Sequence, residues 1–243
     1  MKYILDSHTH TVASGHAYST VHEMAREAAE KGLKLLGITD HSMNMPGTCG
    51  EFHFANLKVL PRELYGIEVM FGTELNIMDF NGTVDMSERL LKRMDVVIAS
   101  LHVPCITAGS VEQNTQAYLK VMENPYVNII GHPDDSRYPV DYEALVQAAK
   151  EREVLLELNN SSLAPYASRE GGKENDLILL NLCKKYQAPI ILGSDAHTQE
   201  DVGDFRYLEP LLEEVQFPEK LIVNRSVEVY KKYINRNKLS SLQ

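Results

Sequence analysis

Seven short apolar runs recur along the 243-residue sequence, and helix-forming segments lie between them. The runs cover residues 3–5, 35–38, 68–71, 96–99, 127–130, 154–158 and 190–192. Runs of this length that are apolar throughout are typical of strands buried on both faces. Because strands that alternate with helices require right-handed crossovers, they pair in parallel. The pattern predicts an α/β fold, first as a distorted seven-stranded (β/α)7 TIM-like barrel and second as a doubly wound open sheet.

Helix boundaries can be read between the strands. Thr20 and Glu23 form a capping-box pattern, and Gly32 stands where a helix-ending glycine belongs. Ser110 and Gln113 repeat the box before a second helix, which is expected to run to about residue 123. Further expected features are helices over residues 87–93, 141–152, 174–186 and 226–236, a helix cap at 198–201, and an irregular loop over 42–61.

The bulk composition limits the partners and the environment of the chain. No repeat, low-complexity tract or linker divides the sequence, so residues 1–243 are expected to form one domain. The formal charge of −10 disfavours binding to long nucleic acid and to anionic membranes. The three cysteines are scattered, which suits a reducing compartment, and neither a signal peptide nor a membrane-spanning run is recognisable. We therefore expect a cytoplasmic protein.

The histidines are concentrated at the ends of the predicted strands. Of the nine, seven lie at or just after such an end, namely His8, His10, His16, His41, His102, His132 and His197. Glu74 lies at a further end of this kind, and Asp195 lies at the same strand end as His197. The carboxyl ends of parallel strands open on one face, where active sites form, and side chains two residues apart in an extended segment point the same way. We interpret the remaining histidines, His22 and His53, as ordinary surface or core side chains, with contact to substrate as the second option for His53.

A shared metal centre explains this clustering better than packing does. Seven imidazoles and two carboxylates with few nearby cations are costly to bury, because unpaired polar groups lose their hydration. Imidazole and carboxylate without thiolate suit zinc first, and iron or manganese as well. Nine ligands exceed the three or four that one zinc ion takes, so more than one ion is expected. The two oxygens of Glu74 could bridge two ions, which also makes Glu74 a predicted catalytic residue.

The strand-end motifs resemble those of a known family. The series DSHTHTVASGHAYST, GITDHS, GTELNI, ASLH, GHPD, ELNNSS and GSDAH is similar to the PHP superfamily, named for polymerase and histidinol phosphatase domains, and especially to its small trinuclear-metal phosphatases. The resemblance covers essentially the whole chain. It implies the PHP fold with a distorted seven-stranded barrel, hydrolysis of phosphoesters, and three divalent metal ions per chain.

The resemblance also divides the nine ligand positions among these three ions. It implies a first ion held by His8, His10, Glu74 and Asp195, a second held by His16, His41 and His197, and a third held by His102 and His132 together with the shared Glu74.

The expected chemistry is hydrolysis of a phosphomonoester. A divalent ion lowers the pKa of bound water toward about 7, so we expect a metal-activated hydroxide as the nucleophile. Two further predicted catalytic residues are Asp40, which would orient the neighbouring ligand His41, and Arg169, which would bind phosphate. Asp40 is also compatible with capping the following loop. Arg137 and Lys173 could reach the phosphate too, although all three cations are equally compatible with a solvated surface.

Two other functions stay open from the residues alone. Amidohydrolases also place an HxH motif and further histidines on a barrel, but many bridge their metals with a modified lysine, and here Glu74 takes that position. A non-catalytic, metal-bound regulatory module is the second, since PHP domains occur in polymerases. The expected partner is a small phosphorylated substrate. The sequence does not identify this substrate. The family resemblance is compatible with a homo-oligomer.

Overall fold

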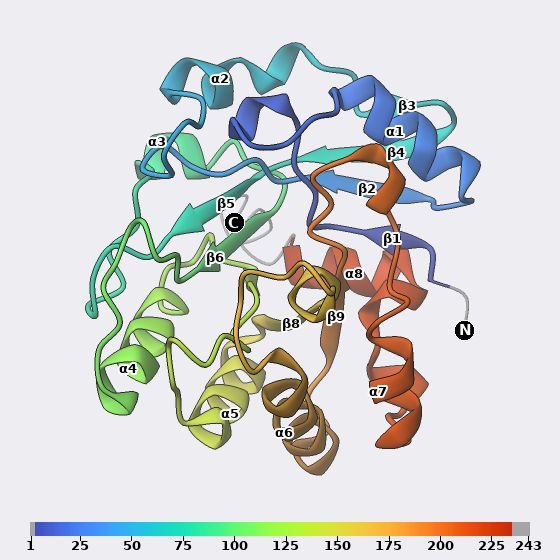
Figure 1. The fold of residues 1–243 in the computed structure, drawn as a ribbon. Coiled ribbons are helices and arrows are strands. Elements are labelled where there is room, and N and C mark those ends of the chain that lie inside the picture. The colour runs from blue at the N-terminus through green and yellow to red at the C-terminus, as the bar shows by residue number, and fades with distance from the viewer. Residues whose placement is uncertain (1–2, 235–243) are drawn as a thin grey trace.

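Two sheets form the centre of the molecule, and parallel strands make up most of both (Figure 1). The computed structural model describes residues 3–234. In the first sheet the strands run in the order β1 (Leu5–Asp6), β2 (Leu35–Ile38), β4 (Ile67–Phe71) and β3 (Glu63–Leu64). In the second they run in the order β5 (Thr73–Asn76), β6 (Val97–Ser100), β7 (Ile129–Ile130), β8 (Leu155–Asn159) and β9 (Ile190–Gly193). All pairs are parallel except the β3–β4 pair, so the predicted α/β class is confirmed.

One extended segment changes its partner at Gly72 and thereby divides the two sheets. Before this glycine β4 pairs with β2, and after it β5 pairs with β6. A Cβ atom at Gly72 would lie 1.9 Å from the carbonyl oxygen of Val96, so a larger residue cannot follow this path. β4 and β5 therefore share the position of the single strand expected at residues 68–71, and β3 is an additional edge strand.

At the other seam, β1 and β9 are joined without a strand ladder. Beyond the strand ends, Thr9 forms a single bridge with Ala196. At the opposite end of the seam lies Asn224, whose side chain accepts a hydrogen bond from the Leu192 amide and donates to the carbonyl oxygens of Leu5 and Leu192. Within residues 3–234 the strands form two sheets and no continuous ladder closes a ring, so the predicted distorted seven-stranded barrel is not confirmed.

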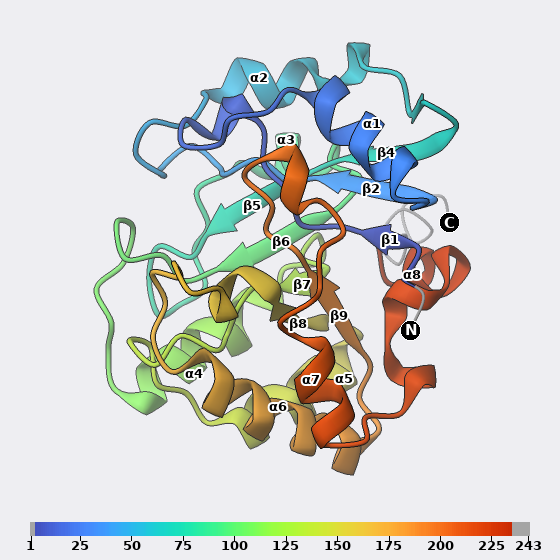
Figure 2. The ribbon, with the colours of Figure 1, turned by 45° about the vertical axis from the view of Figure 1, so that its right-hand side comes forward.

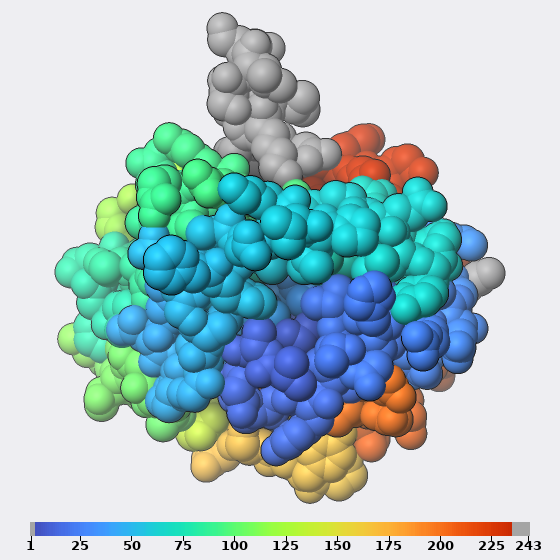
Figure 3. Space-filling view, turned by 90° about the horizontal axis from the view of Figure 1, so that it is seen from above, coloured from blue at the N-terminus to red at the C-terminus, as the bar shows by residue number. Residues whose placement is uncertain are grey.

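Helices cover the outer faces of the sheets (Figures 1 and 2). The α-helices are α1 (Val21–Glu30), α2 (Glu51–Asn56), α3 (Glu88–Leu91), α4 (Val111–Val121), α5 (Tyr142–Arg152), α6 (Gly172–Tyr186), α7 (Glu209–Glu214) and α8 (Val227–Ile234). Short 3₁₀ turns cover Val12–Ser14, Leu57–Val59, Asn160–Leu163, Gln199–Asp201, Glu219–Leu221 and Val223–Arg225. In Figure 1, α1 and α2 lie above the first sheet, and α4, α5 and α6 lie below the second. The face that carries α1 and α2 is formed mainly by the N-terminal third of the chain (Figure 3).

Most of the predicted helix boundaries are confirmed. Both capping boxes form, with Thr20 opening α1 and Ser110 opening α4. Gly32 follows α1 with a φ of 82°, the left-handed conformation expected of a glycine after a helix. Asp141 caps α5 through its side chain. These boundaries are set by neighbouring residues, which is why the sequence predicts them.

Three expected features differ from the structure. The expected irregular loop over 42–61 is wrong in part, because α2 forms within it and buries Phe54, and Leu57 of the following turn is buried too. The cap expected at 198–201 opens only a 3₁₀ turn, since Thr198 makes no capping hydrogen bond. α6 begins at Gly172, two residues before the expected start. Of the helix expected over 226–236, α8 covers its described part, and residues 235–236 lie outside the described range.

The inner faces of the two sheets bury one apolar layer. It consists of Leu5, Leu35, Met70, Val96, Ile98, Ile129, Leu155, Ile191, Val223, Tyr230 and Ile234. Tyr230 and Ile234 come from α8, which therefore covers the base of this layer. Since side chains alternate along a strand, positions two residues beyond Leu155 and Ile191 also face inwards. These positions are polar or small, and the candidate site begins at their level.

No helix within residues 3–234 is long and apolar enough to cross a membrane. Cys49, Cys105 and Cys183 are free. Burial raises the pKa of the Cys49 and Cys105 thiols to about 11, so neither is a thiolate near neutral pH.

Candidate metal centre

A cavity of about 320 Å³ opens at the carboxyl ends of the strands, and the predicted site residues gather around it. Its lining includes His16, His41, His102, His132, Asp195 and His197. The inner part of the same cluster consists of the fully buried side chains His8, His10 and Glu74. All seven strand-end histidines and both carboxylates therefore lie in one region of the fold.

Glu74 lies at the centre of this cluster. Its two oxygens are 2.8–3.5 Å from imidazole nitrogens of His8, His10, His41, His102 and His132. Ser100 Oγ donates a hydrogen bond to Glu74 Oε1 at 2.7 Å. Because Glu74 follows Gly72 by two residues, it stands at the seam of the two sheets and meets histidines from both. This is the position that a bridging carboxylate requires.

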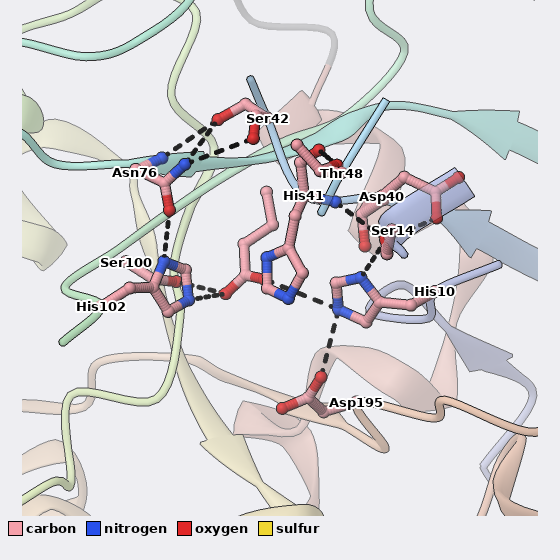
Figure 4. A network of polar contacts seen from close by, with 12 residues as sticks. His10, Ser14, Asp40, His41, Ser42, Thr48, Asn76, Ser100, His102 and Asp195 are labelled. Carbon is pink, nitrogen blue, oxygen red and sulfur yellow. Dashed lines mark hydrogen bonds and ion pairs between the residues drawn. The ribbon is translucent and has the colours of Figure 1, made fainter. Parts of the chain in front are cut away.

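Asp195 is a second carboxylate that contacts several of the imidazoles. Its Oδ1 lies 3.1 Å from His10 Nε2 and 3.6 Å from both His8 Nε2 and His197 Nδ1. Its Oδ2 accepts a hydrogen bond from Arg169 Nη2 at 2.7 Å. Figure 4 shows His10 with one ring nitrogen turned toward Asp195 and the other turned toward the polar groups behind it.

His16 is the most exposed of the predicted ligands and lies at the rim. Its ring centroid is 5.0 Å from that of His41 and 4.9 Å from that of His197. Three groups of ligand atoms are compact enough for an ion: His10, His41 and His197; His8, His10 and Glu74; His41, Glu74 and His102. Of the nine predicted ligands, all within the described residues, His16, His132 and Asp195 belong to none of these groups, although each contacts members of them.

Unpaired buried atoms test whether these residues fit a metal. Within residues 3–234, four atoms at the centre of the cluster lack a hydrogen bond of good geometry: His8 Nε2, His10 Nε2, His41 Nδ1 and Glu74 Oε2. An unsatisfied buried polar group costs about 1–3 kcal/mol. A divalent cation is the partner that imidazole and carboxylate lone pairs can share. The side chains present therefore fit a cluster of divalent metal ions.

The electrostatics of the cluster favour cation binding. Burial alone would raise the pKa of Glu74, but the surrounding imidazoles, that of His102 first, hold it well below its ordinary value. Burial and neighbouring imidazoles lower the pKa of His10 well below its ordinary value, so this ring is neutral. Although burial lowers the pKa of His8, the carboxylates around it, Glu157 first, raise it well above its ordinary value, so a metal ion bound there would displace a proton from this ring. An ionised carboxylate and neutral imidazoles are the forms that bind metal.

Asp40 lies behind the ligands and acts on them through Ser14 (Figure 4). Asp40 Oδ1 accepts hydrogen bonds from the Thr11 amide and from Ser14 Oγ, each at 2.7 Å. Because the one hydroxyl hydrogen of Ser14 goes to Asp40, its oxygen accepts from His10 Nδ1 and from the backbone N–H of His41, both at 3.1 Å. His10 therefore carries its proton on Nδ1 and turns Nε2 toward the cluster.

Replacing Ser14 with alanine should weaken metal binding without unfolding the protein. The substitution frees the His10 ring from Asp40, and losing an outer contact of this kind costs about 10- to 100-fold in metal affinity. Competition with a chromophoric chelator for zinc measures the change. The control is Ser87→Ala, an exposed position whose side chain makes no capping bond. Equal zinc affinity in both variants would contradict this role of Ser14.

The polar residues behind the ligands are not predicted from the sequence pattern. Ser14, Asn76, Ser100 and Glu157 were not proposed, yet each contacts a predicted ligand. Asn76 Oδ1 lies 2.7 Å from His102 Nδ1, and its amide donates to Asp85 at 2.6 Å. For Asn76, Ser100 and Glu157 the available signal is a polar residue in a buried strand, whereas Ser14 lies in the turn Val12–Ser14 and offers no such signal.

The two histidines interpreted as ordinary lie outside the cavity lining. His22 Nδ1 is 3.1 Å from the hydroxyl of Tyr65 on the surface. His53 is half-buried, and its Nε2 lies 3.7 Å from Asp40 Oδ2. His53 therefore borders the polar support of the site without facing the cavity.

Two of the three cations considered for phosphate line the cavity. Arg169 and Arg137 do so, whereas Lys173 lines a neighbouring cavity. Arg169 is held by Asp195, and Arg137 Nε donates to both oxygens of Asp135 at 2.9 and 3.0 Å. Each guanidinium group is thus fixed at the cavity wall by a carboxylate, with further N–H groups left for other acceptors.

The fold and the site together define a parallel α/β protein whose strand ends carry a histidine–carboxylate centre suited to divalent metals. Residues 6–168 match the family described as the PHP domain. The chain belongs to the PHP family.

Full-length relatives and solved structures agree with this assignment. A probable phosphatase of Clostridium novyi (strain NT) is 46% identical over 243 residues, which cover 100% of this chain and 99% of the relative. A probable phosphatase of Acetivibrio thermocellus is 46% identical over 238 residues, covering 98% of each chain. The crystal structure of a histidinol phosphate phosphatase from Lactococcus lactis, complexed with zinc, L-histidinol and phosphate, has a TM-score of 0.58 at 17% identity and covers 89% of this chain and 95% of that one. At that identity the likeness concerns the fold.

Proposed function

We propose that this enzyme hydrolyses phosphomonoesters at a centre of three divalent metal ions. The observation that carries the proposal is the convergence of seven imidazoles and two carboxylates on one cavity whose wall also holds two arginines. Family membership and the probable phosphatases of full length support a phosphate ester as the substrate. Zinc is proposed first, because the structural neighbour was crystallised with it. Iron and manganese suit the same ligands.

The proposed ligand sets follow the family resemblance. A first ion would be held by His8, His10, Glu74 and Asp195, a second by His16, His41 and His197, and a third by His102, His132 and Glu74. The place of Glu74 among five imidazoles supports its sharing between two ions. Divalent ions held there would lower the pKa of water toward neutrality and offset the charge of the phosphoryl oxygens.

The chain's own residues would bind and orient the phosphate. Burial would lower the pKa of Arg169, but Asp195 and Asp134 raise it above its ordinary value, so the guanidinium stays charged. Asn159 and Ser162 accept from Arg169 Nη1, and Asp195 accepts from Nη2. The Nε–H group and the second hydrogen of Nη2 remain for a phosphate oxygen in the cavity. Arg137 offers a second donor from the same wall. Asp40 has no place at the reacting atoms and would act by positioning His10 and His41 through Ser14.

Arg169→Lys is expected to lower kcat/KM for a phosphomonoester roughly 30-fold. A lysine keeps the charge but loses the forked donor geometry, and a hydrogen bond to a charged group contributes about 2 kcal/mol. Steady-state kinetics checks this, with Lys173→Met, outside the cavity lining, as the control. Metal content is measured alongside, because Arg169 also contacts Asp195. An unchanged kcat/KM would remove Arg169 from the site.

A substrate panel tests the proposed function as a whole. The metal-loaded protein should release phosphate from p-nitrophenyl phosphate and from small biological phosphomonoesters. Turnover of lactones or cyclic amides without phosphatase turnover would favour the amidohydrolase alternative. A fully loaded metal centre without turnover on any ester would favour the regulatory module.

The fold and the cellular context complete the proposal. We take the two sheets as the walls of one distorted seven-stranded barrel in a single domain, which the seam at Gly72 and the bridge between Thr9 and Ala196 support. The cytoplasmic location and the preference for small substrates over long nucleic acid stay predictions from composition.

A further inference from the structure

Glu157 is a buried carboxylate that belongs to none of the compact ligand groups, yet it contacts the centre from behind. It lies on β8, two residues after Leu155 of the apolar layer. Its Oε1 is 2.6 Å from His8 Nδ1. Its Oε2 accepts hydrogen bonds from the backbone N–H of His132 at 2.9 Å and from Asn159 Nδ2 at 3.0 Å. Both oxygens are therefore occupied by the protein itself.

These contacts set the state of His8. Two N–H groups, of His132 and Asn159, donate to Glu157 Oε2, so the carboxylate acts as an acceptor. Oε1 then accepts from His8 Nδ1, which leaves Nε2 as the atom that would bind an ion. That Nε2 faces the cluster, 3.4 Å from Glu74 Oε2 and 3.6 Å from Asp195 Oδ1. A metal-binding imidazole needs this arrangement, in which the other ring nitrogen donates to an outer carboxylate.

Glu157 also supports two other predicted ligands. The backbone of His132, which it holds through the amide, has a φ of 29°, a conformation unusual for a residue other than glycine. Asn159 donates its second hydrogen to Asp195 Oδ2 at 3.2 Å, and Asp195 also has a positive φ, of 55°. The carboxylate thus connects ligands that follow β1, β7 and β9.

Gly193 leaves space for this carboxylate. A Cβ atom at Gly193 would lie 1.9 Å from Glu157 Oε1 and 3.1 Å from His8 Cβ. A side chain on β9 at this position would therefore displace Glu157 from His8.

We propose that Glu157 is a positioning residue of the metal centre. By holding His8 directly, His132 through its backbone and Asp195 through Asn159, it sets the geometry in which these side chains meet the ions. The inference rests on the metal centre proposed above and is independent of the substrate.

Glu157→Gln tests this role with almost unchanged shape. Glutamine offers one acceptor oxygen where three donors converge. If that oxygen keeps the bonds to His132 and Asn159, the amide NH₂ faces His8 Nδ1, and the ring must move its proton to the metal-facing Nε2. We expect zinc affinity to fall about 10- to 100-fold. We also expect the Nδ1 proton signal of His8 to disappear from the NMR spectrum of the zinc-loaded protein. Glu214→Gln, an exposed position on α7, is the control.

Each outcome of this experiment decides the proposal. Unchanged zinc affinity with a retained His8 Nδ1 proton in Glu157→Gln overturns it. If the variant does not fold by circular dichroism, the zinc-loaded wild type decides: a slowly exchanging Nδ1 proton on His8 supports the proposal, and a proton on Nε2 overturns it. A wild-type protein that binds no zinc, iron or manganese overturns the metal centre itself and this proposal with it. By contrast, a metal-loaded protein that hydrolyses no phosphate ester overturns the proposed function but not the role of Glu157.

Discussion

Glu74→Gln is expected to lower phosphate-ester turnover about a thousand-fold and to remove at least one metal ion per chain. The carboxylate faces five imidazoles at the seam of the two sheets, and an amide there has no charge and only one acceptor atom. Its NH₂ group would point at imidazole lone pairs. A loss of about 4 kcal/mol in transition-state stabilisation corresponds to this factor.

Elemental analysis and steady-state kinetics on p-nitrophenyl phosphate measure both effects. Glu63→Gln, on the exposed edge strand β3, is the matched control and should keep full metal content and turnover. Circular dichroism establishes that the variant has folded. A folded Glu74→Gln protein with normal metal content and normal turnover would contradict the bridging role.

Removing the metal by chelation should abolish turnover and lower the Tm. Without cations, the unpaired nitrogens of His8, His10 and His41 and the Oε2 of Glu74 face one another in a buried space. A ligand that binds only the folded state stabilises it by about 4 kcal/mol when present at a thousand times its Kd. Thermal unfolding and phosphate release, each with and without EDTA, check the two expectations.

Adding metals back separates specific loading from general salt effects. Zinc, manganese or iron should restore both turnover and Tm, because imidazole and carboxylate ligands suit them. Calcium, which prefers an all-oxygen site, should restore neither. Full turnover after exhaustive chelation would contradict the proposed mechanism.

Much of the site was predictable because its signals are local. Strand β2 was expected and found at residues 35–38, and the remaining inner strands lie within a few residues of their predicted positions. Because parallel pairing brings the strand ends together, the residue types at those ends predict the cluster around Glu74. Helix caps such as Thr20 were predictable for the same reason, since the cap and its partner are three residues apart.

The rest depends on contacts between distant segments. The change of partner at Gly72 arises because the Val96 carbonyl comes too close for any side chain, and Val96 is 24 residues further along the chain. In the sequence Glu157 is a single charge within an apolar strand. Its contact with His8, 149 residues away, is formed only by the fold. The helix α2 forms in a polar stretch because Phe54 is buried against the core. A single sequence does not show which distant residues contact each other.

The placement of α8 has a consequence for how the chain acquires its structure during synthesis. Tyr230 and Ile234 complete the innermost apolar layer, and that layer lies directly under the ligands. Because α8 follows every described strand in the chain, the two sheets are synthesised before the residues that cover the base of this layer. The floor beneath Leu155 and Ile191 is therefore the last part of the inner layer to be completed.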